Sequence, residues 1–462
     1  MNLIARLKAL VNRLLPRASF ARSVGVLAGG TAAAQAIGVL VLPVITRLYT
    51  PADLSLLAVY SSILGFVAVV ACLRLDIAIP LPERDEDAAN LLALALLCCT
   101  AFAALAALAV WWFPRHIVKA ISQPGLQPFL WMIPLGIWLA SAYSAVQFWA
   151  IRKKRFTEIT KTRLSQTLGS VAAQLGFGLW GVVGPFGLLL GQLINSGAGI
   201  FGLGRIAWRY EGHSFRQVSV ANMLSVLRAH DRFPKYSTFE ALANNAGIQL
   251  PILFIAAVAM GSEAGYIFLA MRVMGVPMTL IGGAVSQVYL SRAPGELREQ
   301  SLGLFTENIF SNLVRLGVGP LIFIGIVAPA IFPFIFGAKW QRAGELVTWM
   351  TPWFIFQFLS SPISMVMHIT GNQRKMLLLT FFGGMLRLAA VIMAWSVFQG
   401  YVSEFYSVAS AIVYLFYGWI FLRASGVGAR KIASCILRNF YLFIAWVFFG
   451  GVFRMVMVSI SV

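Results

Sequence analysis

The sequence predicts an all-α membrane protein that crosses the bilayer many times. Apolar residues make up 59% of its 462 residues, charged residues make up only 11%, and the mean hydropathy is +0.82. A soluble domain of ordinary composition is far more polar. A helix needs roughly 20 mostly apolar residues to cross about 30 Å of hydrocarbon, and stretches of that kind recur along almost the whole chain.

Thirteen apolar stretches are long enough to be transmembrane helices. Twelve of them are expected to form the core of the fold, and the thirteenth is expected to be an additional C-terminal span. The predicted spans are 24–46, 55–73, 91–113, 128–150, 164–184, 187–204, 236–258, 264–290, 308–335, 346–369, 376–398, 404–422 and 440–460.

A long polar connection at 205–235 divides the chain into two halves. The six spans within 24–204 form a predicted N-terminal bundle, and the six within 236–422 form a C-terminal bundle. Residues 1–23 form a basic amphipathic segment that is expected to lie on the inner leaflet, and 423–462 add a basic loop and the extra apolar helix. A cleaved signal peptide is the alternative for the N-terminus, although the first apolar run is longer than such peptides require.

The two halves show a weak internal repeat. Gln35 and Pro43 in the first half are matched by Gln249 and Pro251 in the second. Because each half has an even number of spans, a duplication would leave both halves in the same orientation. The repeat therefore predicts pseudo-symmetric bundles related by an axis along the membrane normal.

The basic residues are concentrated on one side of the predicted topology. With the N-terminus in the cytoplasm, cytoplasmic segments carry 27 Lys and Arg, the opposite side carries 6, and 3 lie within spans. This distribution follows the positive-inside rule. The formal charge of +20 is thus explained by topology, and nucleic acid is not an expected partner because short loops cannot build a basic, aromatic-rich surface.

Several kinds of chemistry lack their sequence motifs. No Gly-Lys pair occurs, so a phosphate-binding loop of the GxxxxGK[ST] type is excluded. The four cysteines and four histidines are scattered, so no metal site and no cofactor are predicted. The longest loop on the non-cytoplasmic side, 114–127, is too short to hold a catalytic triad or paired acids, which disfavours a glycosyltransferase or polymerase.

Three arginines lie inside predicted spans. Arg387 is the deepest, Arg272 follows, and Arg315 is shallow enough for its side chain to reach the cytoplasmic surface. A charge at the centre of a span costs roughly 2.5–3.5 kcal/mol, so it usually faces a cavity or a partner. Two interpretations stay open for Arg272 and Arg387: they line a cavity, or they form ion pairs with an acid such as Glu240 or Glu263.

Amide side chains are frequent at membrane depth. Each of them alone is best explained as a hydrogen bond between helices, but as a set they also suit a hydrated interior that contacts sugar hydroxyls. They are Gln35, Gln147, Gln174, Gln192, Asn195, Asn244, Asn245, Gln249, Gln287 and Gln357.

Several segments resemble one family of membrane proteins. They are ITRLYTP at 45–51, LRLDIAIPLPERDEDAANLLALAL at 73–96, FPKYSTFEALANNAGIQLPILFIAAVAMG at 233–261, LAMRVMGVPMTLIGGAVSQVY at 269–289 and FGAKWQRAGELVTWMTPWFIFQFLSSPIS at 336–364. Their order and content resemble the Wzx-type oligosaccharide flippases of the multidrug/oligosaccharidyl-lipid/polysaccharide exporter superfamily.

The resemblance implies a MATE-like pair of six-helix bundles around a central cavity that opens alternately to each side of the bacterial inner membrane. It implies transport, without covalent chemistry, of undecaprenyl-diphosphate-linked oligosaccharides for O-antigen, capsule or exopolysaccharide synthesis. A polymerase and chain-length proteins of the same pathway are possible partners. The residues expected to contact the diphosphate or glycan are Arg272, Arg387, Arg47, Asn244, Gln249 and Gln35.

The energy source is expected to be an ion gradient or removal of the product, because no nucleotide motif occurs. Glu240, Asp53 and Asp76 are the candidates for ion coupling or gating. The alternative function is an ion-coupled multidrug antiporter of the same superfamily. It would require acidic side chains deep in the first bundle, whereas the deep charges here are arginines.

Overall fold

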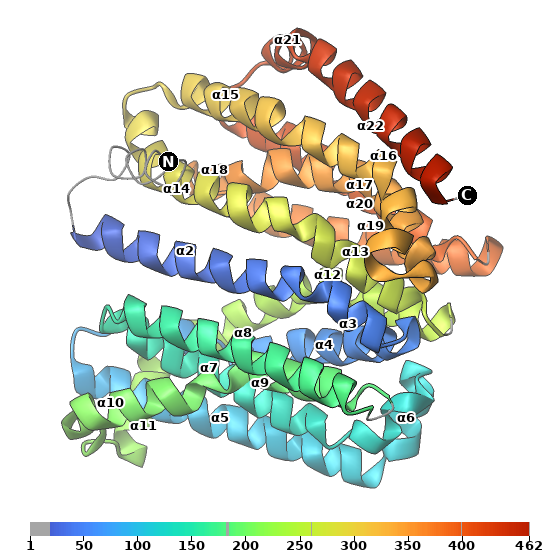
Figure 1. The fold of residues 1–462 in the computed structure, drawn as a ribbon. Coiled ribbons are helices and arrows are strands. Elements are labelled where there is room, and N and C mark those ends of the chain that lie inside the picture. The colour runs from blue at the N-terminus through green and yellow to red at the C-terminus, as the bar shows by residue number, and fades with distance from the viewer. Residues whose placement is uncertain (1–18, 182–183, 260, 399, 462) are drawn as a thin grey trace, which may run out of the picture.

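The computed structural model describes residues 19–181, 184–259, 261–398 and 400–461. Helices account for most of these residues, and no strand occurs among them (Figure 1). The predicted all-α polytopic fold is therefore confirmed. Residues 1–18, most of the predicted amphipathic segment, lie outside the described residues.

The N-terminal half contains long helices joined by short ones. They are α2 (Ser19–Leu40), α3 (Leu42–Leu48), α4 (Pro51–Ala71), α5 (Asp85–Trp112), α6 (Pro114–Ile121), α7 (Met132–Arg152), α8 (Phe156–Leu179), α9 (Phe186–Gly197), α10 (Gly199–Phe215) and α11 (Val220–Ala229), with short turns η1 (Asp76–Ala78) and η2 (Pro124–Phe129).

The C-terminal half has the same character and more interruptions. Its helices are α12 (Thr238–Val258), α13 (Glu263–Pro277), α14 (Gly283–Arg298), α15 (Leu302–Leu313), α16 (Gly319–Phe336), α17 (Gln341–Ser360), α18 (Val366–Ile369), α19 (Gln373–Val397), α20 (Val402–Ala424), α21 (Ala429–Arg438) and α22 (Phe440–Ser461). The short elements between them are η3 (Phe233–Ser237), η4 (Met278–Gly282), η5 (Val314–Val318), η6 (Ala338–Trp340) and η7 (Ser361–Ile363).

Ten helical stretches of the described chain are long and apolar enough to cross a membrane. The three other predicted spans correspond to α7, α8 and α17, which are helices of 21, 24 and 20 residues. The structure is consistent with twelve spans plus one, and that exact count stays a prediction. The connection at 205–235 is largely helical, because α10 continues to Phe215 and α11 follows it.

Prolines interrupt several spans where the sequence places them. The π-helical turn η4 follows Pro277 directly, and Pro362 lies in η7 between α17 and α18. Proline lacks an N–H donor and its ring clashes with the preceding turn, so the helical hydrogen bonds rearrange locally. The helical stretch Glu263–Arg298 continues through η4, whereas α17 ends at Ser360 and is followed by η7 and the short α18.

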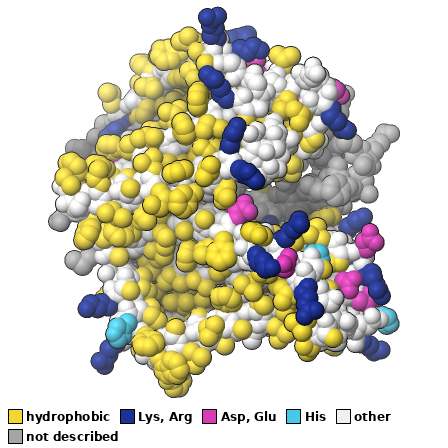
Figure 2. Space-filling view, turned by 180° about the vertical axis from the view of Figure 1, so that it is seen from behind, with side chains coloured by type: hydrophobic (Ala, Val, Ile, Leu, Met, Phe, Trp, Pro, Cys, Tyr) yellow, Lys and Arg dark blue, Asp and Glu magenta, His cyan; other side chains and the backbone are white. Residues whose placement is uncertain are grey.

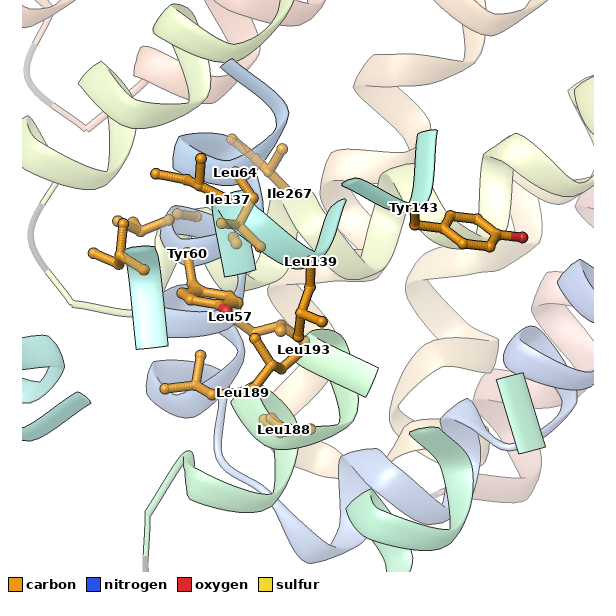
Figure 3. Close-up of a cluster of buried hydrophobic side chains, with 14 of the residues drawn as sticks. Leu57, Tyr60, Leu64, Ile137, Leu139, Tyr143, Leu188, Leu189, Leu193 and Ile267 are labelled. Carbon is orange, nitrogen blue, oxygen red and sulfur yellow. The ribbon is translucent and has the colours of Figure 1, made fainter. Parts of the chain in front are cut away.

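Apolar side chains from several helices form the core of the N-terminal half. Tyr60 on α4 packs with leucines of α9 and with Ile137 of α7, and Ile267 of α13 joins them from the other half (Figure 3). The buried Tyr60 hydroxyl donates to the carbonyl oxygen of Met132 at 3.1 Å. Burial of this polar group is tolerated because it is hydrogen-bonded.

The last helix adds to the C-terminal half from outside. α22 packs mainly on α16, where Phe323 meets the rings of Trp446, Phe449 and Phe453 with centroid distances of 5.4–5.9 Å. Most other apolar side chains of α22 are exposed, as expected of a helix that faces lipid.

The two halves meet closely at one end of the molecule, here called the closed end. Trp340 Nε1 donates to the carbonyl oxygen of Thr46 at 3.0 Å. A Cβ atom at Gly265 would lie 2.1 Å from the Pro51 carbonyl oxygen, so glycine lets α13 approach the start of α4. α4 also packs on α12, which makes it the main contact between the halves.

The opposite end, here called the basic end, carries the connections at 72–85, 152–156, 298–302 and 424–429. Figure 2 shows Lys and Arg side chains gathered at this end, where they border a hollow between the two lobes. The closed and basic ends thus differ in both charge and packing.

One helix crossing depends on two glycines. A Cβ atom at Gly384 of α19 would lie 2.8 Å from the Cα atom of Gly247 in α12. We expect Gly384→Ala to lower the stability by about 1–3 kcal/mol, because the helices must separate. Thermal unfolding of the purified protein in detergent measures this effect.

Gly451→Ala is the matched control, since a Cβ atom there meets nothing within 4 Å. Equal unfolding temperatures for both variants would contradict the proposed close crossing of α12 and α19.

Candidate substrate cavity

A polar cavity of about 340 Å³ lies in the N-terminal half and is completed by α13 of the other half. Toward the closed end it is bounded by Leu42, Ile45, Leu54 and Leu57. Its polar lining consists of Thr31, Gln35, Tyr143, Gln147, Arg163, Gln166, Thr167, Ser170, Gln174, Gln192, Asn195 and Arg272. This is an unusual density of amides for a membrane interior.

α8 supplies one whole wall of this cavity. Arg163, Gln166, Ser170 and Gln174 are spaced three and four residues apart, so they lie on one face of the helix. Arg163 Nη1 donates to Thr31 Oγ1 of α2 at 2.6 Å. The wall is continuous because the helical period brings these side chains into line.

Arg163 is a cavity residue that the sequence analysis missed. We expected residues 151–163 to form a cytoplasmic loop, but α8 begins at Phe156, so Arg163 is already helical. The helical spacing of the polar residues from 163 to 174 was the pattern that could have revealed it.

Other amides in the cavity have free hydrogen-bonding groups. Gln35, Gln147 and Asn195 make no hydrogen bond with another described residue. Tyr143 points away from the apolar cluster in Figure 3, and its hydroxyl lies 3.5 Å from Thr162 Oγ1. Groups of this kind can donate to and accept from a polyhydroxylated ligand.

A second cavity of about 320 Å³ lies where the halves meet. Gln35, Phe268 and Arg272 line both this cavity and the first, so the two are adjacent. Gln249 of α12 faces it, and a Cβ atom at Gly65 of α4 would lie 2.6 Å from Gln249 Nε2. The wall of this second cavity is therefore shared by both halves.

Arg272 is the charged group at the junction of the two cavities. Its Cζ atom lies 5.1 Å from the centroid of the Phe268 ring, which gives a cation–π contact. Arg272 makes no ion pair or hydrogen bond with any described residue. Glu263, which we had considered as its partner, instead pairs with Arg342 at 3.0 Å.

Arg387 lies in a third, separate cavity of about 140 Å³ together with Asn244. In this structure Arg387 and Arg272 line different cavities, so their predicted joint contact with one ligand stays a prediction. α12 packs on α4 and also on α19, so it stands between the second cavity and Arg387.

Arg47 and Glu240 lie outside all three cavities. Arg47 is exposed in the last turn of α3 at the closed end, and Glu240 is exposed in the first turn of α12. Neither side chain lines the polar interior in this conformation, because Arg47 lies at the end of α3 and Glu240 lies at the start of α12.

Asp53 has a structural contact that the sequence analysis did not consider. It forms a capping box at the start of α4, where its Oδ2 accepts from the Thr50 amide at 2.9 Å and the Thr50 hydroxyl at 2.7 Å. Burial, together with Asp53, raises the pKa of the neighbouring Tyr49 to about 12. The protonated Tyr49 hydroxyl donates to the Gln174 carbonyl oxygen at 2.7 Å.

Asp76 is buried at the basic end of the N-terminal half. Its Oδ2 accepts from the Ser144 hydroxyl at 2.7 Å, while Oδ1 is enclosed without a partner. Nearby, Arg152 donates to the Pro82 carbonyl oxygen at 2.5 Å and pairs with Asp85 at 3.0 Å. Asp76, Pro82 and Asp85 of the 73–96 segment therefore fix this loop to α7.

The fold is that of a multi-pass membrane protein and is similar to the folds of solved transporters. Lipid II flippase MurJ, in an inward closed conformation, superimposes with a TM-score of 0.67 at 13% identity over 94% of this chain and 98% of that chain. A MOP superfamily transporter from Pyrococcus furiosus gives 0.55 at 12% identity over 88% and 96%. An inward-facing multidrug MATE transporter gives 0.51 at 15% identity over 87% and 94%.

Sequence comparison defines the family. Residues 44–345 match the polysaccharide biosynthesis protein family, and the chain belongs to it. The succinoglycan biosynthesis transport protein ExoT of Rhizobium meliloti (strain 1021) is 22% identical over 411 residues, which cover 84% of this chain and 77% of that protein.

Two substitutions separate capping from ion coupling at Asp53. We expect Asp53→Ala to lower the stability by about 0.5–1.5 kcal/mol, because the hydrogen bonds from Thr50 to Asp53 are lost while Thr50 remains as the N-cap, whereas Asp53→Asn retains an acceptor oxygen. Thermal unfolding and glycan export by cells carrying each variant give the two measurements. Loss of export by Asp53→Asn with an unchanged unfolding temperature would contradict a purely structural role.

Proposed function

We propose that this protein moves undecaprenyl-diphosphate-linked oligosaccharides across the bacterial inner membrane by alternating access, for O-antigen, capsule or exopolysaccharide synthesis. Family membership and the relationship to a succinoglycan transport protein support this substrate class. The observation that carries the proposal is Arg272, a cation without an ion pair to a described acid, which lines both the amide-rich cavity and a second, mainly apolar cavity at the junction of the halves.

The charge of Arg272 matches the diphosphate. A guanidinium cannot be neutralised by deprotonation in a protein, and its planar fork binds phosphate oxygens in pairs. Since no described acidic side chain lines either cavity, the guanidinium is free for an anionic ligand. Arg163, at the other end of the first cavity, adds a second positive charge.

The glycan would lie among the amides. Gln35, Gln147 and Asn195 are free to exchange hydrogen bonds with sugar hydroxyls. Amides accept and donate equally, so they can bind different sugars without a fixed pattern. The lipid tail would remain in the bilayer and reach the cavity through an opening between helices.

The side of the membrane to which the protein is closed follows from the difference between the basic end and the closed end. We place the basic end and the N-terminus in the cytoplasm, on the basis of the positive-inside rule. In this orientation the structure is closed toward the outside by the Trp340–Thr46 hydrogen bond and the Gly265 contact. Outward release would require these contacts to separate.

Ion coupling, if the transport cycle uses it, has one candidate with suitable burial. Asp76 is buried with one unpaired carboxylate oxygen, whereas Glu240 is exposed and Asp53 caps a helix.

A polymerase and chain-length proteins would receive the product on the outer side.

A multidrug antiporter is the alternative, and the cavity charge argues against it. Cationic drugs would meet Arg163 and Arg272, with no described acid in the cavity lining to attract them. Restored drug resistance in a pump-deficient strain would favour this alternative.

Arg272→Ala tests the proposal. We expect a fall of about 10–100-fold in transport, because a charge-assisted hydrogen bond to the diphosphate is lost. Arg272→Lys should give an intermediate rate, since it keeps the charge and loses the fork. The measurement is flipping of a fluorescent undecaprenyl-diphosphate-linked sugar in proteoliposomes, with surface glycan in cells as a second readout.

Arg454→Ala is the control, because Arg454 is exposed on α22 and lines none of the cavities. Unchanged flipping by Arg272→Ala at equal expression would refute the role of this cavity.

A further inference from the structure

We propose that the cavity around Arg387 in the C-terminal half binds one small inorganic anion, of the size of chloride or phosphate. This site is separate from the proposed path of the lipid-linked oligosaccharide, and its existence does not depend on that function.

The first argument is the uncompensated charge. Arg387 is only 6% exposed, and its Nε and Nη2 atoms are enclosed without a hydrogen-bond acceptor. It has no ion pair with a described acid. Its one favourable contact is with the Tyr414 ring, whose centroid lies 5.0 Å from Cζ. A buried charge left without a counter-ion is strongly destabilising.

The second argument is the lining of the cavity. Asn244, Ser361 and Tyr414 have side-chain donors that make no hydrogen bond with another described residue. No acidic side chain lines this cavity among the described residues. Free donors around a fixed cation are the chemistry that recognises an anion and repels a cation.

The third argument is size and position. The cavity has about 140 Å³, against 340 and 320 Å³ for the two central cavities, and it shares only Ile248 with the second of them. It therefore has room for a small anion and a few waters but not for an oligosaccharide. Its lining comes from α12, the end of α17, η7 and the residues after it, α19 and α20.

The position of these elements indicates how a bound anion would affect the stability of the C-terminal half. The cavity lies beside the close crossing of α12 and α19 at Gly247 and Gly384. An anion on Arg387 with donors from neighbouring helices would stabilise this arrangement of the C-terminal half by mass action.

Thermal unfolding of the purified full chain in detergent tests the site. Sodium gluconate, whose anion is too large for the cavity, is replaced by sodium chloride or sodium phosphate at constant ionic strength. We expect either small anion to raise the unfolding temperature by about 2–4 °C, with saturation, in the wild type. The rise should persist in Arg272→Ala and disappear in Arg387→Gln.

Asn244→Leu provides a second variant, because Asn244 is exposed to the cavity and its replacement need not disturb the core. It should weaken the anion effect severalfold. Equilibrium dialysis of Arg272→Ala, which lacks the arginine proposed to bind the diphosphate, with radiolabelled phosphate and chloride should still show one saturable site, even if Arg387→Gln does not fold.

Three results would overturn the proposal. They are an unfolding temperature in chloride or phosphate that is no higher than in gluconate, a rise that survives in Arg387→Gln or is lost in Arg272→Ala, and the absence of saturable binding in dialysis. Failure of flipping by Arg272→Ala would leave these anion measurements unaffected, so the two proposals are tested separately.

Discussion

The need to enclose polar side chains within hydrocarbon is the constraint on which this structure depends. A polar face on α8, with Arg163, Gln166, Ser170 and Gln174 in line, cannot face lipid without a large cost. It therefore turns inward, where α2, α7 and α9 present amides of their own and α13 presents Arg272. The cavity is the space that these faces share.

Close helix contacts at glycine occur at the junction of the two halves and within the C-terminal half. Gly265 permits contact between α13 and α4 at the closed end, and Gly247 and Gly384 permit the crossing of α12 and α19. At these glycines the helices approach each other through backbone atoms. The cavities lie where the helices are farther apart. Two printed side-chain hydrogen bonds join the described halves there, from Trp340 to the Thr46 carbonyl oxygen and from Gln123 to the Ala256 carbonyl oxygen, so separation of this end would break both.

The distribution of charge divides the molecule by function. Acidic residues are engaged at its ends: Glu263 and Glu404 bind Arg342, Asp53 caps α4, and Asp85 pairs with Arg152. Arginines remain unpaired inside. This distribution of charge suits an interior that attracts anions. The deep arginines are compatible with the fold because each has a cavity or an aromatic ring beside it.

Sequence alone determined the helical membrane fold, because apolar composition and span length are local properties that hydrocarbon selects directly. It also singled out Arg272 and Gln35, since a polar group deep in an apolar run stands out without any structure. The tertiary structure decided which of these groups meet. Arg387 lies deeper in its span than Arg272, but α12 separates the two, and Arg163 enters the cavity from a segment expected to be a loop. Which face of a helix turns inward, and what it meets there, depends on packing between segments far apart in the chain.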